Sequence, residues 1–303
     1  MNRTRLLLCV LIFSLNSCND STTTNNPKPY HINSQITVDH LSRTYTLALP
    51  PQYYETDTTF ALVIGLHGTG GSAAQFERDY GLTAKANREG FIAVYPEGVR
   101  SDGPLGIRTW NAGECCDYAM QHSIDDVKFI STLIDELIAK YKINPRRIYA
   151  TGMSNGAMMV YRLACDIPHK LAAIAPVSGT LMANTCNPSR AIPIIHIHSA
   201  LDTKVPAAGG IGLAGYYFHP VDSALNVFAT INSCTSPQQT SKGTCQQTSW
   251  TTCQTPTSLQ YYLTTDGGHA WPGGQPASPR ADKPSTALIA NDLIWEFFKK
   301  YSL

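Results

Sequence analysis

One stretch near the middle of the chain constrains the fold more than any other. An apolar run at 148–151 leads into Gly152-Met-Ser-Asn-Gly156, and a segment rich in alanine and methionine follows. A strand, a sharp turn and a helix in this order give the Gly-x-Ser-x-Gly pattern its meaning. The turn crowds the residues two before and two after the serine, so both must be glycine. We expect Ser154 to stand above a sheet edge as a nucleophile; the alternative is an ordinary glycine-bounded turn.

Strand-like and helix-like segments alternate along most of the chain. Continuous apolar runs, typical of strands buried on both faces, occur at 60–67, 91–95, 171–177, 192–198 and 259–263. Apolar residues at helical spacing predict helices over 73–89, 124–141, 221–232 and 286–301. This alternation predicts an α/β fold with a mostly parallel central sheet and helices on both faces. An opening hairpin is expected over 32–49, and a long loop over 99–123. No compositional boundary interrupts 30–303, so one catalytic domain is expected there.

Composition limits the possible partners. The 303 residues carry a formal net charge of +1 and are 43% hydrophobic, which is enough for a large core. A near-neutral charge with no basic run argues against nucleic acid as a partner. No Cys-x-x-Cys pair and no Cys/His cluster has the spacing of zinc ligands, so we expect disulfides rather than a metal site.

The first residues have the features of an export signal. A basic segment, Asn2–Arg5, precedes a short apolar core and then Leu15-Asn-Ser-Cys18, which resembles the bacterial lipobox. We expect a lipoprotein signal peptide over 1–17, lipidation of Cys18 at a membrane surface, and a flexible tether over 18–29. The alternative is a simple secretory signal with an incidental cysteine. Either reading places the mature protein outside the cytoplasm.

Cysteine usage agrees with export to an oxidising compartment. Without Cys9 and Cys18, seven of the nine cysteines remain, so at least one cannot pair within the chain. A polar stretch over 233–257 is expected to be a surface loop closed by a disulfide. The possible pairs are Cys165–Cys186, Cys234 with Cys245 or Cys253, and a vicinal Cys115–Cys116 bridge or separate partners for those two.

Two further strand ends carry residues that a serine nucleophile needs. Asp202 follows the strand at 192–198 and His269 follows the last strand, so the chain order is Ser, Asp, His, as in the α/β-hydrolases. His269 would take the proton of Ser154 during attack, and Asp202 would orient the imidazole. The carboxyl ends of parallel strands meet at one sheet edge, which would gather the three side chains.

An oxyanion needs backbone donors close to the nucleophile. We expect the N–H of Asn155 and that of Thr69 to supply them. Thr69 lies in the glycine-rich turn after His67, where small residues let bare backbone approach a substrate carbonyl. His67 is expected to brace this turn.

Each assignment has a competitor in the sequence. Asp126 and Asp222 are alternatives to Asp202, but both lie where a helix begins and look like caps. His196 and His198 alternate with isoleucines inside a strand, which favours a structural role over that of His269.

Two tryptophans lie in loops beside the predicted site. Trp110 and Trp271 either line the acyl or alcohol pocket or belong to the core, as most tryptophans do. Together with aromatic residues at 216–218 they would make a pocket suited to a cinnamoyl group.

Five ordered motifs carry a resemblance to a known family. They are His67-Gly-Thr-Gly-Gly-Ser72, Thr109–Cys116, Thr151–Met159, Ile195–His198 with Asp202 and Val205-Pro206, and Gly268–Gly273. Together they resemble the polyhydroxybutyrate-depolymerase-like and feruloyl-esterase-like branch of secreted α/β-hydrolases, from about Arg43 to Phe298. The resemblance implies cofactor-free hydrolysis of carboxylic esters, with Ser154, Asp202 and His269 at the triad positions.

The chain departs from that family pattern in two places. Ser199 stands where the branch usually has glycine after His198, and Asp117 follows the cysteine pair where glycine is common. The expected substrates are feruloyl or acetyl esters of plant polysaccharide. A polyhydroxyalkanoate depolymerase or oligomer hydrolase is the alternative, and a non-catalytic surface lipoprotein is an alternative of another class.

Overall fold

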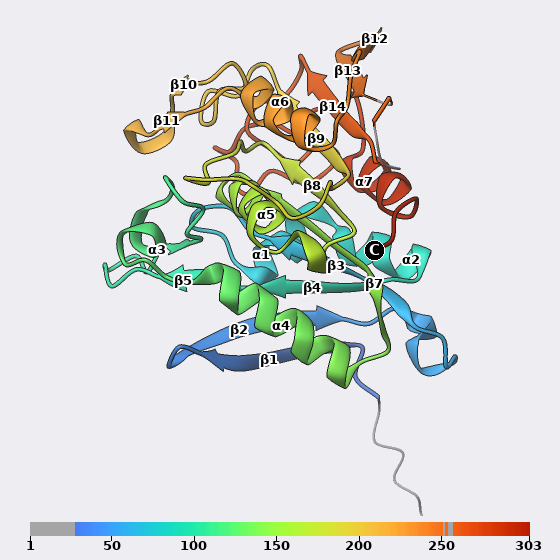
Figure 1. The fold of residues 1–303 in the computed structure, drawn as a ribbon. Helices are drawn as coiled ribbons and strands as arrows, with labels where there is room; N and C mark the ends of the chain where they lie inside the picture. The colour runs from blue at the N-terminus through green and yellow to red at the C-terminus, as the bar shows by residue number, and fades with distance from the viewer. Residues whose placement is uncertain (1–27, 251, 254–256) are drawn as a thin grey trace, which may run out of the picture.

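One ten-stranded sheet forms the centre of the molecule (Figure 1). The computed structural model describes residues 28–250, 252–253 and 257–303. The strands of the sheet are β1 (His31–Val38), β2 (Leu41–Ala48), β3 (Phe60–Leu66), β4 (Ile92–Pro96), β7 (Ile143–Met153), β8 (Ala173–Val177), β9 (Ile194–Ser199), β12 (Gln238–Lys242), β13 (Cys245–Trp250) and β14 (Leu259–Thr264). Their spatial order is β1-β2-β4-β3-β7-β8-β9-β14-β13-β12.

The middle of the sheet is parallel and its edges are antiparallel. Strands β4, β3, β7, β8, β9 and β14 run parallel to one another. Strands β1 and β2 complete one edge and β13 and β12 the other, all paired antiparallel. Every residue of β3 is buried, and its Ile64 pairs with Val94 on one side and Ala150 on the other. The predicted mostly parallel sheet is confirmed.

Helices cover both faces of the sheet. On one face lie α4 (Asp126–Lys140), α5 (Asn155–Asp166) and α6 (Val221–Ile231), whose apolar sides join one buried cluster. On the other face lie α1 (Ala73–Tyr80), α2 (Leu82–Glu89) and α7 (Ala290–Phe298), which join a second cluster. Because the central strands are parallel, their carboxyl ends, and hence the loops that follow them, all lie at one edge of the sheet.

The loops contain several short helices and strands. They are α3 (Asp117–Gln121), β5 (Val99–Arg100), β6 (Arg108–Thr109), β10 (Gly210–Ile211), β11 (Tyr217–Phe218) and the 3₁₀ turns Pro51–Tyr54, Pro168–Lys170 and Leu213–Gly215. The expected long loop over 99–123 therefore contains β5, β6 and α3. The β10–β11 hairpin extends from the body of the molecule at the left of Figure 1.

Three helix predictions need correction at their ends. The helix expected over 73–89 is two helices, because Gly81 adopts a left-handed φ of 67° and ends α1. The closing helix begins at Ala290 rather than at 286. Asp125, not Asp126, caps α4 by accepting a hydrogen bond from the N–H of Lys128. Asp126 is fully buried and pairs with Arg43 at 2.6 Å.

The polar stretch that was expected to be a loop contains two strands in its described part. It contributes β12 and β13, which pair with each other and extend the sheet beyond β14. The β12 residues are all exposed, so backbone hydrogen bonds rather than apolar burial hold this edge strand.

Three disulfides link described residues. Cys165 pairs with Cys186 as expected, and Cys234 pairs with Cys253 rather than Cys245, which is free. Cys115 and Cys116 form the vicinal bridge.

The N-terminal predictions largely fall outside the described residues. The signal peptide over 1–17, the lipidated Cys18 and nearly all of the tether over 18–29 belong to this part of the chain. No helix in the described ranges is long and apolar enough to cross a membrane.

Candidate active site

Ser154 lies at the sharp turn between β7 and α5. Its backbone has φ 58° and ψ −123°, a conformation that residues other than glycine rarely adopt. The N–H of Ser154 donates to the carbonyl of Val177 at 2.9 Å, which fixes the turn to the neighbouring strand β8. The side chain stands at the carboxyl edge of the sheet while the residue is only 7% exposed.

Close packing explains the two glycines of the turn. A Cβ atom on Gly152 would lie 2.5 Å from the carbonyl oxygen of Gly156. A Cβ on Gly156 would collide with the carbonyl oxygens of Leu66 and His67. The residues two before and two after Ser154 therefore need glycine, as the sequence predicted, and the second glycine also lets α5 pack against the end of β3.

His269 and Asp202 approach Ser154 from the loops after β14 and β9. His269 Nε2 lies 2.9 Å from Ser154 Oγ, and His269 Nδ1 lies 2.7 Å from Asp202 Oδ2. The backbone N–H of His269 donates to Asp282 at 2.9 Å, which fixes the loop that carries the imidazole. The structure thus brings the three predicted side chains into one hydrogen-bonded row.

Asp202 is surrounded by donors. The backbone N–H groups of Lys204 and Val205 donate to its Oδ1 at 2.9 and 2.8 Å. His198 Nε2 lies 3.3 Å from the same Oδ2 that faces His269. Burial favours the neutral acid, but these hydrogen bonds from His198 and His269 outweigh it and keep the pKa of Asp202 well below its usual range. Asp202 is therefore a fixed anion.

A buried row of side chains lies behind Asp202. His198 Nε2 is 2.8 Å from the carbonyl oxygen of Val205, which can only accept, so this nitrogen carries the proton. His196 Nε2 then donates to His198 Nδ1 at 3.1 Å, and the Tyr161 hydroxyl donates to His196 Nδ1 at 2.8 Å. Burial lowers the pKa of His196 well below its ordinary value, so it stays neutral. The contact of His198 with Asp202 was missed, because the strand pattern shows only that both histidines alternate with isoleucine.

Thr69 and Asn155 both line the cavity beside Ser154. Asn155 is the first residue of α5, so its backbone N–H has no acceptor within the helix. Among the described residues, the N–H of Thr69 has no backbone acceptor either. A Cβ on Gly68 would lie 3.2 Å from the Cβ of Ser154, so the turn passes directly over the nucleophile. Both residues thus line the same cavity as the nucleophile.

Trp110 links the turn after β3 to the start of α5 instead of lining a pocket. The Asn155 amide accepts from the backbone N–H of Trp110 at 2.7 Å and donates to its carbonyl at 2.9 Å. The indole N–H of Trp110 donates to the carbonyl of His67 at 2.9 Å. Trp110 is fully buried. Its role as a brace was missed because a loop tryptophan carries no sequence signal for it.

His67 braces the turn that carries Thr69, as expected. Its Nε2 accepts from the N–H of Gly98 at 3.0 Å, so Nδ1 carries the proton and donates to the Gly68 carbonyl at 2.8 Å. Burial lowers the pKa of His67 to about 4, so the ring is neutral at physiological pH.

Trp271 also belongs to the core, being 1% exposed. It stacks on Tyr80 with ring centroids 5.0 Å apart and lies edge-on to Phe76. Of the two alternatives for Trp110 and Trp271, the structure therefore supports the core, and neither lines the cavity beside Ser154.

The competing acids lie elsewhere. Asp126 accepts from Arg43 and from the N–H of Asn111. Asp222 lies in the first turn of α6 without capping it. Within the described ranges no group of three or more His, Cys, Asp or Glu side chains is arranged to hold a metal ion.

Residues 43–242 match the sequence profile of the family described as esterase PHB depolymerase. The chain belongs to this esterase family. Feruloyl esterase B of Piromyces equi is 28% identical over 264 residues, 84% of this chain but only 44% of that protein. Feruloyl esterase C of Emericella nidulans is 28% identical, covering 84% of this chain and 83% of that protein.

A solved structure identifies the fold of this esterase family member. The acetyl xylan esterase from Aspergillus awamori superposes with a TM-score of 0.62 at 16% identity, covering 88% of this chain and 99% of that chain. The chain has the α/β-hydrolase fold.

Proposed function

We propose that the protein hydrolyses carboxylic esters through Ser154, His269 and Asp202. The observation that carries the proposal is the row from Ser154 Oγ to His269 Nε2 at 2.9 Å and from His269 Nδ1 to Asp202 at 2.7 Å. No other described aspartate takes that position beside the imidazole. Membership of an esterase family supports the same reaction.

The first half of the reaction forms an acyl-enzyme. Ser154 Oγ attacks the ester carbonyl carbon while its proton passes to His269 Nε2, and the carbonyl oxygen becomes an oxyanion between the N–H groups of Thr69 and Asn155. The tetrahedral intermediate collapses, the ester C–O bond breaks, and His269 returns the proton to the leaving alcohol.

The second half reverses these roles. Water gives its proton to His269 Nε2 and its oxygen attacks the acyl carbon. The second tetrahedral intermediate releases the carboxylic acid as His269 protonates Ser154 Oγ. Asp202 stays ionised throughout and holds the Nδ1 proton of the imidazole.

We further propose feruloyl or acetyl esters of plant polysaccharide as the substrates, because the relatives named above include feruloyl esterases. Depolymerisation of polyhydroxyalkanoate is the second candidate, favoured by the description of the matching family. Three disulfides support a location outside the cytoplasm. Anchoring through lipidated Cys18 is part of the same proposal and rests on the sequence alone.

Two experiments test this function. A fluorophosphonate should label the protein and should fail to label Ser154→Ala; an unlabelled wild type would favour a non-catalytic binding protein. A panel of methyl ferulate, acetylated xylo-oligosaccharide, p-nitrophenyl esters and hydroxybutyrate oligomers then separates the substrate classes. Turnover of the hydroxybutyrate oligomers alone would overturn the polysaccharide assignment.

A further inference from the structure

The cavity beside Ser154 is small. Its volume is about 20 Å³, and Ser154, Thr69 and Asn155 all line it. That volume counts only the positions open to the centre of a water-sized group, so the cavity takes a short acyl chain of a few atoms, such as acetyl. A feruloyl group, with its ring and methoxy substituent, is several times larger.

The position of His269 shows which part of an ester this cavity would receive. Of the described triad residues, Ser154 lines the cavity and His269 does not. The leaving alcohol must lie against His269, since the imidazole protonates it. The acyl group of an ester bound at Ser154 therefore extends to the other side, into the cavity.

Most of the cavity wall is rigid. Cys116, Met158, Val205 and Phe218 line it, and each of them is at most 5% exposed and belongs to one buried apolar cluster. Close-packed interiors resist changes of volume, so these side chains cannot retreat without loss of packing.

The remaining wall is a flap, defined as residues 210–217, which contains β10, the turn Leu213–Gly215 and the first residue of β11. Leu213, Ala214 and Tyr216 of the flap line the cavity, and they are partly or fully exposed. The flap is tied to the loop of Asp202, because the N–H of Leu213 donates to the carbonyl of Lys204 at 2.8 Å. These flap residues have solvent behind them into which they can move.

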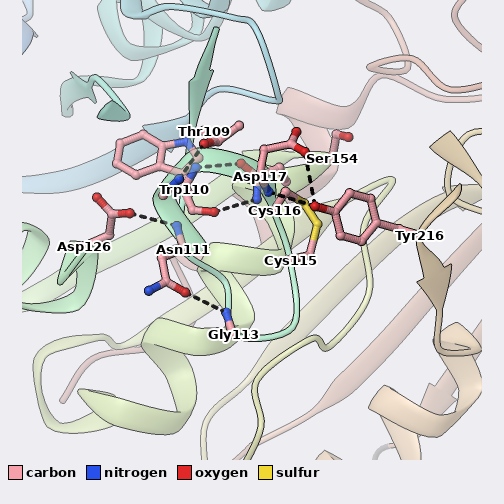
Figure 2. The surroundings of a disulfide bond; sticks show 12 residues. Thr109, Trp110, Asn111, Gly113, Cys115, Cys116, Asp117, Asp126, Ser154 and Tyr216 are labelled. Carbon is pink, nitrogen blue, oxygen red and sulfur yellow. Dashed lines mark hydrogen bonds between the residues drawn. A yellow bond between two sulfur atoms is a disulfide. The ribbon is translucent and has the colours of Figure 1, made fainter. Parts of the chain in front are cut away.

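Two hydrogen bonds fasten the flap across the cavity. The Tyr216 hydroxyl accepts from the backbone N–H of Asp117 at 3.0 Å and donates to Asp117 Oδ1 at 3.1 Å. Figure 2 shows both bonds, with Tyr216 pointing toward Asp117 beside the vicinal disulfide. Asp117 has a positive φ of 45°, which turns its N–H and its carboxylate toward the same partner. A glycine at this position would keep the first bond and lose the second.

We propose that Tyr216, fastened to Asp117, is the residue that restricts the acyl group to a short chain such as acetyl. This inference rests on the proposed ester hydrolysis and narrows its substrates to esters of short acids such as acetate. Tyr216 acts by closing space and takes no part in bond making or breaking. Burial raises the pKa of the Tyr216 hydroxyl, so it remains a donor to Asp117 under ordinary conditions.

Acyl-chain dependence tests the proposal. The wild type should hydrolyse p-nitrophenyl acetate with a far higher kcat/KM than the hexanoate, since each methylene that does not fit costs about tenfold or more. Tyr216→Ala should lower the acetate-to-hexanoate ratio at least tenfold, mainly by raising kcat/KM for the hexanoate. Tyr216→Phe, which keeps the ring and loses both hydrogen bonds, should fall between the two.

The matched control is Ile211→Ala, on β10 of the same flap, whose side chain is 68% exposed and does not line the cavity. It should leave the ratio unchanged. A wild type that turns over the hexanoate or methyl ferulate as well as the acetate overturns the inference without any variant and leaves ester hydrolysis intact. An unchanged ratio in a folded, acetate-active Tyr216→Ala also overturns it. A wild type that neither hydrolyses any ester nor binds fluorophosphonate overturns both proposals.

Discussion

The two sides of the active site are held by different kinds of interaction. On the nucleophile side, the turn after β3 and the turn before α5 are fixed by close packing of Gly68 and Gly156 against neighbouring backbone. Neutral hydrogen bonds complete it: the Trp110 indole N–H donates to the His67 carbonyl, and His67 Nδ1 donates to the Gly68 carbonyl. None of these contacts needs a charge.

On the acid–base side, hydrogen bonds to carboxylates hold the loops that carry Asp202 and His269. Asp202 accepts from two backbone N–H groups and faces two histidines. Asp282 accepts from the backbone N–H of His269, and Asp266 accepts from Ser285 and Thr286. Hydrogen bonds to ionised groups are stronger than neutral ones, and they fail when the group is neutralised.

The nucleophile side therefore depends on the shape of its packed residues, and the acid–base side depends on charge. A change of volume should damage the nucleophile side and reduce stability, whereas a change of charge should damage the acid–base side and reduce turnover.

Replacing Asp202 by Asn should lower kcat by about 10⁴-fold. The amide keeps the size of the carboxylate but presents N–H groups where His269 and His198 need an acceptor, so the imidazole loses its tautomer. Thermal unfolding and kcat on p-nitrophenyl acetate, measured on the same preparation, check this. A fall below tenfold, or a parallel loss of folding, would contradict the division.

Replacing Gly156 by Ala should lower the free energy of unfolding by about 3 kcal/mol, the upper range for overpacking. The added Cβ meets the carbonyl oxygens of Leu66 and His67, which are backbone atoms and cannot move freely. Denaturant unfolding measures the effect. Gly103→Ala is the matched control, since its Cβ would find nothing closer than 3.8 Å. Equal stability in both variants would show that packing does not hold this side.

The nucleophile side was also the more predictable of the two. Continuous apolar runs identify β3 and β7, and the glycine pattern at 152–156 fixes the turn because few residues fit it. Assigning Ser154, Asp202 and His269 required only that the ends of the strands be located in the sequence. These features follow from local rules.

The features that the sequence did not predict depend on contacts between segments that lie far apart in the chain. The hairpin β12–β13 has a polar sequence without apolar alternation, so only its pairing with β14 makes it a strand. The role of Trp110 requires Asn155, which lies 45 residues further along the chain. The Tyr216–Asp117 bonds join residues 99 apart, and no short pattern encodes them.

The two sides should also respond to acid in different pH windows. The pKa of His67 is lowered by burial from 6.5 to about 4, so the unfolded chain binds a proton between these values while the folded chain does not. Stability contributed by neutral His67 is therefore lost as pH falls from about 6.5 to 4, by on the order of 3 kcal/mol at most.

On the acid–base side the window lies lower. Burial raises the pKa of Asp266, but hydrogen bonds from Ser285 and Thr286 outweigh it and lower the value to about 2. Its contribution is present above about pH 4 and lost as pH falls toward 2. Unfolding free energies measured across pH should lose part of the upper slope in His67→Gln, where His196 still contributes, and part of the lower slope in Asp266→Asn, where Asp202 still contributes. The same slopes in both variants would contradict the assignment.

The smallest effect is expected from Asp282→Asn, which tests whether charge on this side acts through the position of His269. The substitution weakens the bond from the His269 backbone N–H, now 2.9 Å, and removes the attraction to Lys204. We expect kcat to fall about tenfold, since a bond to a charged group is worth about 1.5 kcal/mol or more. KM for p-nitrophenyl acetate should not change, because Asp282 does not line the cavity. Asp266→Asn serves as the control: it loosens the same loop without touching His269, so a comparable fall in kcat there would show that loop mobility, and not the placement of the imidazole, limits turnover.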